Sequence, residues 1–367
     1  MKIGIMTMHR VQNMGSVLQA YALQYKIKQL GYESELIDYA FPPVKEKRFT
    51  AKDLVKQCWD AIHGFPEKKR KKKIEDFRIR FLTCSDKTYD RNLLLAEPPR
   101  YDLYCTGSDQ VWNPFHVGND TSFMMDFAPV DAPRIAYASS FATREVAEPY
   151  FSLYAKYLLH YREITVREES GIDIVRKMTG KQAQVVCDPT LLLSPEEWGG
   201  LANSSTLNVP KKYVLIYLLG YMFNPRPGFY SIVDEVSKAL KLPVYIVNPF
   251  ASDSVKRGVK AIRGVGPADF VRLFKEASFV VTDSFHGAAF ATIFNVPMIG
   301  VVKDEHNGDG RIATLRSKVG GEQSIQCHNT PFTMKGSDVV LFRCDSNKVD
   351  ILRTYSTEVL KNMIAKT

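Results

Sequence analysis

The sequence predicts an α/β protein with two Rossmann-like domains that face a cleft. Short apolar runs alternate with helical patterns in both halves of the chain, which is typical of βαβ units and a mostly parallel sheet. A polar stretch separates the two series, and a length of 367 residues fits two domains. We therefore expect an N-terminal domain at residues 1–201, a linker at 202–212, a C-terminal domain at 213–345 and a final helix at 346–367.

The N-terminal half contains short apolar runs that predict strands at residues 3–7, 35–39, 101–106, 134–139, 164–167 and 185–187. Apolar side chains at helical spacing predict helices between several of these strands, at residues 16–30, 150–161 and 168–178. Gly31 is a typical helix end, because glycine tolerates the left-handed conformation found there. We expect a basic helical insertion near residues 41–82.

The C-terminal half repeats the same alternation. Its apolar runs predict strands at residues 213–219, 244–247, 279–282 and 298–302. Helical spacing predicts helices at residues 231–240 and 267–276, one that begins near Ser284, and a final one at residues 347–366. This half is therefore expected to form the second Rossmann-like domain.

The composition is that of an ordinary globular protein, with 45% hydrophobic and 24% charged residues. No apolar run approaches the roughly 20 residues that a membrane-spanning helix needs, and the first residues read as a strand rather than a signal peptide. We therefore expect a cytoplasmic protein. The six cysteines are scattered singly, without the CxxC pair that zinc or dithiol chemistry favours, so we expect reduced thiols and no metal site.

The positive charge is concentrated in one segment. The formal net charge is +9, and the segment from Phe41 to Arg80 holds 13 Lys and Arg against 6 Asp and Glu. The rest of the chain is nearly neutral, which argues against nucleic-acid binding. The centre of the segment is the run from Lys68 to Lys73 (KKRKKK), which is either a solvated helix face or a peripheral contact with anionic lipid at the inner membrane face.

Polar loops follow several predicted strands, where open parallel sheets bind their ligands. The first is residues 9–16 (HRVQNMGS), in which Gly15 lets a ligand approach the backbone and Ser16 can cap the next helix. We place His9, Asn13 and Gly15 at the acceptor side of the cleft. Ordinary turn chemistry is the alternative, and without GxGxxG no dinucleotide is indicated.

The second loop, residues 107–114 (GSDQVWNP), follows a buried strand. Asp109 and Gln110 can hold sugar hydroxyls, and Trp112 can serve as an apolar platform beneath them. A structural Asx-type turn capped by tryptophan packing is the alternative interpretation.

The third loop, residues 282–287 (TDSFHG), gives the sharpest prediction of a site. Asp283 or Ser284 can cap the helix that follows, which leaves His286 in its first turn beside backbone N–H groups that favour an anion. Histidine can also act there as a general acid or base near neutral pH.

Two arginines complete the set of candidates. Arg167 ends a predicted strand and Arg311 follows a polar loop, and each can clamp a carboxylate or phosphate. No GxSxG, Walker loop, HExxH or DxD pair is present, which argues against a hydrolase, an NTPase and metal-dependent glycosyl transfer.

Together these segments resemble the polysaccharide pyruvyl transferase family. The matching pieces occur in family order over roughly residues 1–302, with a weaker match at NGDGRIATL, and they are HRVQNMGSVLQAYAL, DLYCTGSDQVWNP, RIAYASSFA, ITVREESG, VVCDPTLLLSPEEW and FVVTDSFHGAAFATIFNVPMIGV. The resemblance implies the two-domain glycosyltransferase arrangement called GT-B. It also implies transfer of an enolpyruvyl unit from phosphoenolpyruvate to two hydroxyls of a glycan or lipid-linked saccharide, with a pyruvate ketal and phosphate as products and no cofactor.

The resemblance also implies roles for the candidate residues. His286 matches the family's histidine in the helix-opening motif and, with Asp109, is expected to form the acid/base pair. Arg167 matches the donor-binding arginine, and Ser284, Gly287 and Arg311 join it in a donor site carried by the C-terminal domain. Many members have arginine two residues before the histidine, where this chain has Ser284, so a basic donor contact must come from elsewhere or be absent.

Two other functions remain open on the sequence. One is a GT-B-like glycosyltransferase with a nucleotide-activated donor, for which Tyr221, Phe250 and residues 264–266 are the candidate base platforms. The other is a non-catalytic family member that binds glycans.

Overall fold

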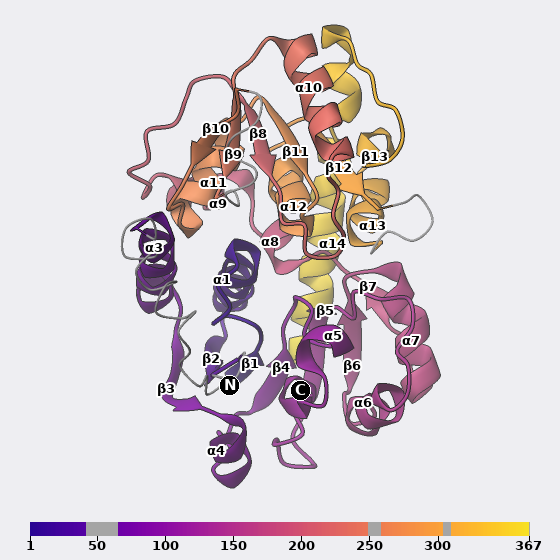
Figure 1. Cartoon of the computed structure of the whole chain (residues 1–367). Coiled ribbons are helices and arrows are strands. Elements are labelled where there is room, and N and C mark those ends of the chain that lie inside the picture. Colours follow the sequence, from indigo (N-terminus) through magenta and orange to yellow (C-terminus); the bar gives the residue numbers. More distant parts are fainter. Residues whose placement is uncertain (42–64, 249–257, 304–309, 367) are drawn as a thin grey trace, which may run out of the picture.

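The computed structural model describes residues 1–41, 65–248, 258–303 and 310–366. Within these residues the chain forms two parallel sheets, each covered by helices on both faces (Figure 1). This arrangement confirms the predicted α/β class with two Rossmann-like domains. Parallel strands covered on both faces are apolar throughout, and β5 (Arg134–Ser139), β11 (Phe279–Thr282) and β12 (Met298–Val302) are buried along their whole length.

The first sheet has the strand order β3-β2-β1-β4-β5-β6-β7. Its strands besides β5 are β1 (Lys2–Met6), β2 (Glu33–Tyr39), β3 (Cys84–Tyr89), β4 (Leu103–Thr106), β6 (Glu163–Val166) and β7 (Gln184–Val185). The helices in this part of the chain are α1 (Met14–Gln29), α3 (Phe65–Phe81), α4 (Arg91–Ala96), α5 (Pro114–Val117), α6 (Tyr150–Leu158), α7 (Glu169–Thr179), α8 (Pro189–Leu192) and α9 (Pro195–Ala202).

The second sheet repeats this topology with the order β10-β9-β8-β11-β12-β13. Its strands besides β11 and β12 are β8 (Val214–Tyr217), β9 (Val244–Val247), β10 (Lys260–Ile262) and β13 (Ile325–Cys327). Its helices are α10 (Gly228–Leu240), α11 (Pro267–Glu276), α12 (Phe285–Ile293) and α13 (Arg311–Lys318), and α14 (Ser346–Ala365) ends the described chain. Both sheets therefore have the doubly wound Rossmann order, in which the strand order reverses between two central neighbours.

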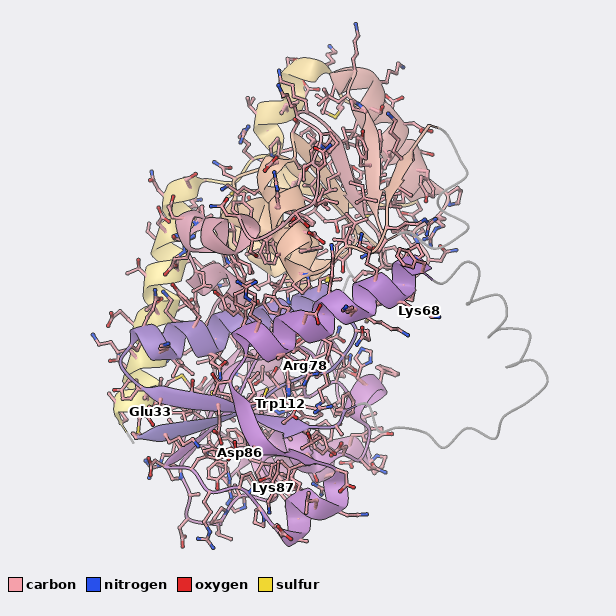
Figure 2. All side chains as sticks on the ribbon, turned by 90° about the vertical axis from the view of Figure 1, so that its left-hand side faces the viewer. Glu33, Lys68, Arg78, Asp86, Lys87 and Trp112 are labelled. Carbon is pink, nitrogen blue, oxygen red and sulfur yellow. The ribbon has the colours of Figure 1, made fainter. Side chains whose placement is uncertain are left out.

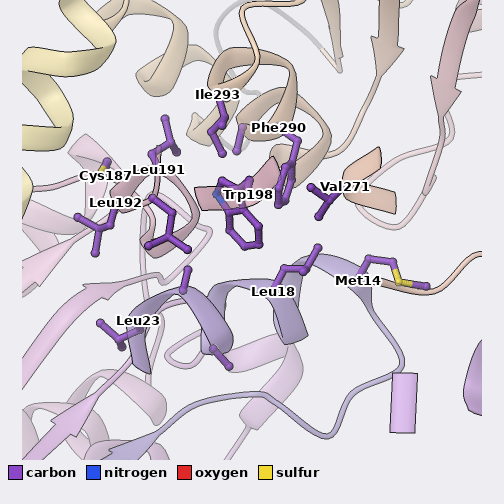
Figure 3. Packing of buried hydrophobic residues seen from close by; sticks show 14 of the residues in the cluster. Met14, Leu18, Leu23, Cys187, Leu191, Leu192, Trp198, Val271, Phe290 and Ile293 are labelled. Atoms are coloured by element: carbon purple, nitrogen blue, oxygen red, sulfur yellow. The ribbon is translucent and has the colours of Figure 1, made fainter. Parts of the chain in front are cut away.

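One hydrophobic core joins the two domains. It contains Ile3 of the first sheet and Val280 of the second, and between them Leu18 of α1, Trp198 of α9 and Phe290 of α12 pack together (Figure 3). The Trp198 and Phe290 ring centroids lie 5.0 Å apart. An interface with a continuous apolar core holds domains in one arrangement more firmly than a polar interface does.

The chain passes from the first sheet to the second through α8 and α9. The first sheet ends at Val185 and the second begins at Val214, and α9 already packs against α11 of the second domain before residue 202. Helix α14 runs back from the second domain to the first (Figure 1). There the Ser356 hydroxyl accepts a 2.9 Å hydrogen bond from the backbone N–H of Cys187, so the final helix is tied to the first domain by polar as well as apolar contacts.

Helix α3 carries the basic run and lies along α1 and against α11, with Lys68 at the end nearest the second domain (Figure 2). The Lys73 ammonium pairs with Asp269 at the start of α11, and Arg70 donates to the backbone oxygen of Gln12 at 3.1 Å. Phe77 is buried in the core. Residues 42–64 of the predicted basic insertion lie outside the described residues.

Candidate active site

The two sheets place their reversal points opposite each other. In the first sheet the order reverses between β1 and β4, and in the second between β8 and β11. The loops that follow β1, β4, β8 and β11 all contribute to one pocket of about 400 Å³ between the domains. Open α/β sheets bind ligands at such points, so the topology alone makes this pocket the candidate active site.

The pocket takes its polar lining from both domains. The first domain contributes Asn13, Ser16, Asp109, Gln110, Thr143 and Arg144, and the second contributes Asp283, Ser284, His286, Lys303 and Arg311. Most of the residues predicted for the cleft are therefore brought together.

The loop before α12 is built by short hydrogen bonds. Thr282 Oγ1 donates to the Tyr217 backbone oxygen at 2.6 Å and accepts from the Ser284 backbone N–H at 3.0 Å. Ser284 Oγ accepts from the Gly287 N–H at 3.3 Å, which makes Ser284 the predicted helix cap. A side chain at Gly287 would have its Cβ 2.4 Å from Thr282 Oγ1, so this close approach requires glycine.

Asp283 fixes the neighbouring loop rather than the helix. Its two carboxylate oxygens accept 2.7 Å hydrogen bonds from the backbone N–H groups of Leu219 and Gly220 after β8. Burial raises the pKa of Asp283, which the two backbone donors oppose.

His286 reaches from the second domain into the first. Its ring lies against Gly15 at the start of α1, where any larger residue would have its Cβ 2.0 Å from the ring nitrogen Nδ1. Gly15 therefore serves the site by leaving room for the imidazole. His286 is 7% exposed, so it is a buried residue rather than the surface histidine that a first-turn position suggests.

Asp109 is held in the first-domain wall of the pocket in a left-handed conformation, with φ of 77°. Its carboxylate accepts a hydrogen bond from the Ser16 hydroxyl and lies 3.8 Å from Arg167 Nη2. Burial acts to raise the pKa of Asp109, but the charges of His286 and Arg167 and the Ser16 hydroxyl outweigh it and lower the pKa. The helix cap at α1 is Asn13, which accepts from Gly15 N–H at 2.8 Å, and not Ser16.

Asp188 is the main residue that the sequence analysis missed. It is fully buried at the start of α8, and its Oδ2 accepts from Arg167 Nη1 at 2.8 Å and from Ser108 Oγ at 3.0 Å. His286 Nε2 lies 3.7 Å from the same oxygen. Burial acts to raise the pKa of Asp188, yet His286 and Arg167 hold it well below its usual range.

Arg167 lies beneath the pocket rather than in it. Its side chain is 1% exposed and bonded to Asp188, and its guanidinium carbon lies 4.3 Å from the centroid of the Phe285 ring. Phe285 lines the pocket and covers the arginine. In this structure Arg167 therefore orders the carboxylates around His286, and its position does not support the predicted direct contact with the donor.

Two predicted cleft residues lie elsewhere, and the first is His9. It is fully buried and its Nε2 is 2.9 Å from Asp38 Oδ1, in a group that also includes Arg10. Cys84 lies close enough to His9 and Asp38 for the three to offer ligand atoms to a metal, but the Asp38 carboxylate is already engaged by Arg10 and by Thr88.

The second is Trp112, which does not offer its ring to a sugar. It is fully buried, its Nε1 donates to the Phe123 backbone oxygen at 3.2 Å, and its ring packs on Phe141. This outcome matches the structural alternative for the second loop. Gln110, by contrast, lines the pocket and accepts a 2.6 Å hydrogen bond from Asn113.

Of the described candidate platforms for the base of a nucleotide donor, one lines the pocket and the others lie outside it. Tyr221 lines the pocket and is 64% exposed. Gly264 and Gly266 lie against the side chains of Lys69 and Lys73 on α3. Phe250 lies outside the described residues.

Solved structures with the same arrangement of two domains are GT-B-type enzymes. UDP-GlcNAc 2-epimerase of Methanocaldococcus jannaschii is 12% identical with a TM-score of 0.56, and both chains are covered over 100% of their length. The enzyme of the same name from Neisseria meningitidis is 10% identical with a TM-score of 0.53 and the same full coverage. At such identities the likeness shows the fold alone, and it confirms the predicted GT-B-like architecture.

The sequence also matches a known protein family. No curated protein matches the sequence. A model of one family, polysaccharide pyruvyl transferase, matches residues 13–304, which include the loops around Asp109, Arg167, Asp188 and His286. Because this match covers most of the chain and all of the pocket's central residues, the chain belongs to the polysaccharide pyruvyl transferase family.

Proposed function

We propose that this protein transfers an enolpyruvyl unit from phosphoenolpyruvate to two hydroxyls of a glycan or lipid-linked saccharide, forming a pyruvate ketal and releasing phosphate. The observation that carries the proposal is the interdomain pocket, in which His286 of one domain and Asp109 of the other line the same space. Membership of the family supports the same chemistry. No cofactor takes part in the proposed reaction.

The donor carries a carboxylate and a phosphate, and the pocket offers cations for both. Arg144 comes from the first domain, and Lys303 and Arg311 come from the second. Ser284 supplies no charge, so these three side chains take the role of basic donor contacts. Arginine suits such groups because its guanidinium can bind carboxylate or phosphate through two parallel hydrogen bonds.

The proposed first step adds one acceptor hydroxyl to the donor. The methylene carbon takes a proton from the His286 imidazolium and becomes a methyl group, while the hydroxyl oxygen bonds to the central carbon. Asp109 takes the proton of that hydroxyl. Its lowered pKa means that it is ionised at neutral pH, and it accepts the proton as the hydroxyl oxygen bonds to the central carbon, because that bond makes the proton strongly acidic.

The second step replaces phosphate with the other hydroxyl. The bond between the central carbon and the phosphate oxygen breaks, and phosphate leaves with the electron pair and takes the proton from Asp109. The second hydroxyl oxygen then bonds to the central carbon, and its proton returns to His286. Both residues end in the state in which they began, so a single acid/base pair serves both steps.

Released phosphate separates the proposed function from its alternatives. Purified protein incubated with phosphoenolpyruvate and candidate saccharides should release phosphate only when a suitable acceptor is present. A nucleotide-donor glycosyltransferase would release a nucleoside diphosphate from a nucleotide sugar instead, in line with the UDP ligands named for GT-B-like neighbours. A glycan-binding member would bind the acceptor and turn over neither donor.

We further propose that the protein works in the cytoplasm, at the inner face of the membrane. None of the helices in the described part of the chain is long and apolar enough to cross a bilayer. On α3, Lys68, Lys71 and Lys72 are exposed, and Phe65 at its start is 73% exposed. Exposed lysines of this kind can hold a protein reversibly on anionic lipid, which would bring the pocket near a lipid-linked acceptor.

A further inference from the structure

Hydrogen bonds to both oxygens hold the carboxylate of Asp188 in place. Its Oδ1 accepts from the backbone N–H of Thr190 at 2.9 Å and from the Thr190 hydroxyl at 2.7 Å. Its Oδ2 accepts from Arg167 and Ser108. These donors keep the side chain ionised although burial acts to raise its pKa, and they hold it in one orientation.

His286 is held differently. Its Nε2 has no hydrogen-bond partner among the described residues, and a carboxylate oxygen, Asp188 Oδ2, lies 3.7 Å away. That separation is too long for a hydrogen bond but short enough for a strong charge interaction in a buried site. Asp188 can therefore favour the charged imidazolium without taking up the proton that is to be transferred.

The charged groups of the site come from several elements around the ring. They are Asp109 after β4, Arg167 and Glu168 after β6, Asp188 before α8, Asp283 before α12, and Arg144, Lys303 and Arg311 around the pocket. Glu168 faces the backbone instead, since one of its oxygens accepts from the N–H groups of Phe141 and Ala142, and burial raises its pKa. Asp188 is the carboxylate that pairs with the ring through Nε2.

We propose that Asp188 is a positioning residue for His286: from the first domain, it places a fixed negative charge opposite Nε2 of the imidazole that the second domain contributes. The proposal rests on the proposed function, in which the imidazolium donates a proton to the donor. It also explains the place of Arg167, which fixes Asp188 from below. The acid of this site is then complete only where the two domains meet.

Asp188→Asn tests the proposal through the proton on the ring. NMR of histidine-labelled full-length protein, with the His286 signal assigned by its loss in His286→Gln, follows the ring's titration without any substrate. Because an opposite charge favours the charged form of a neighbouring group, removing it should move the titration of the ring to lower pH than in the wild type. A titration midpoint identical to that of the wild type overturns the proposal.

The pH profile of phosphate release gives a second reading. In Asp188→Asn the basic limb of kcat/KM should move to lower pH by the same amount, while Asp188→Glu, which keeps the charge, should hold the limb near its wild-type position. A merely structural role would lower kcat in both variants without moving the limb, and this result overturns the proposal. If wild-type protein releases no phosphate, the proposed function fails, and the NMR titration still decides the role of Asp188.

Two further variants serve as a control and as a replacement if Asp188→Asn fails to fold. Asp173→Asn removes an exposed carboxylate of the first domain, and it should leave both titrations unchanged. If Asp188→Asn does not fold, Asp188→Ser replaces it, because serine keeps an oxygen that can cap the start of α8. The expected and the contradicting results are the same as for asparagine.

Discussion

Among single substitutions in the pocket, the loss of His286 should have the largest effect on activity. General acid–base groups contribute roughly 100- to 10,000-fold to a rate, so His286→Ala should lower phosphate release by that range. The ring is buried, and its removal leaves a small space beside Gly15, so thermal unfolding should shift only modestly. Activity measured beside the melting temperature separates the two effects, and activity within a few-fold of wild type would make His286 a structural residue.

Gly15 gives a steric test of the same site. In Gly15→Ala the new methyl group would overlap the His286 ring, so the imidazole must move and activity should fall at least tenfold, since even small misplacements of a catalytic group are costly. Gly200→Ala on α9 is the matched control, because nothing lies within 4 Å of its Cβ position. Equal activity in the two variants would show that the ring has no fixed place against Gly15.

The sequence predicts some site residues better than others. Residues in loops after strands, such as Asp109 and His286, could be found because parallel topology gathers those loops at one edge. Asp188 also follows a predicted strand, at 185–187, but an aspartate before Pro189 is typical of an ordinary helix cap, which it also is, so its position does not single it out. Trp112 and His9 were placed in the cleft because local sequence spacing does not reveal burial. It shows neither the core position of Trp112 nor the pairing of His9 with Asp38.

At the scale of elements, buried strands are predicted well and edge strands poorly. The predicted strands at 134–139, 279–282 and 298–302 coincide with β5, β11 and β12. Three edge strands were not predicted: β3 with the polar sequence CSDKTY, and β10 and β13 with three residues each. Edge strands are short and polar because an exposed apolar edge would pair with other chains, so they lack the apolar run that identifies a buried strand.

On helix α3, some residues of the basic run contact the rest of the protein and others are exposed to solvent. Arg70 and Lys73 make contacts within the protein, and Phe77 is committed to the core, so the exposed lysines are the side chains of this helix that can meet a membrane. Each contributes about 1 kcal/mol near an anionic surface. Changing Lys68, Lys71 and Lys72 together to Gln should therefore weaken sedimentation with anionic vesicles at low salt by more than about tenfold.

The control for this measurement changes three exposed lysines elsewhere, Lys177, Lys238 and Lys361, to Gln. It should leave vesicle binding nearly unchanged, and raising the salt should release the wild type as the Debye length shortens. If wild-type protein stays in the supernatant at low salt, the basic run does not bind the membrane and is only a solvated helix face.

The stability of the whole molecule should fall at low pH because buried carboxylates become protonated. Burial acts to raise the pKa of Asp38, but the hydrogen bonds from Arg10 and His9 outweigh it and hold the pKa below its usual range. A lowered pKa contributes stability that is present above the unfolded value of about 3.9 and is lost as the pH falls through the folded value. Asp38→Asn should thus be clearly less stable than wild type at pH 7, and the difference in unfolding free energy should shrink below about pH 4. A difference that stays constant with pH would exclude this linkage.

The fate of the donor's methylene carbon shows directly whether the pocket transfers a pyruvyl unit. Wild-type protein is incubated in D₂O with phosphoenolpyruvate labelled with ¹³C at that carbon, together with a saccharide acceptor, and the product is followed by NMR. Proton donation within the pocket predicts that the label moves into a methyl group on the acceptor, with one deuterium, in step with phosphate release and with loss of both signals in His286→Ala. A label that stays in a methylene group, while the same protein modifies the acceptor in a parallel incubation with a nucleotide sugar, would contradict pyruvyl transfer.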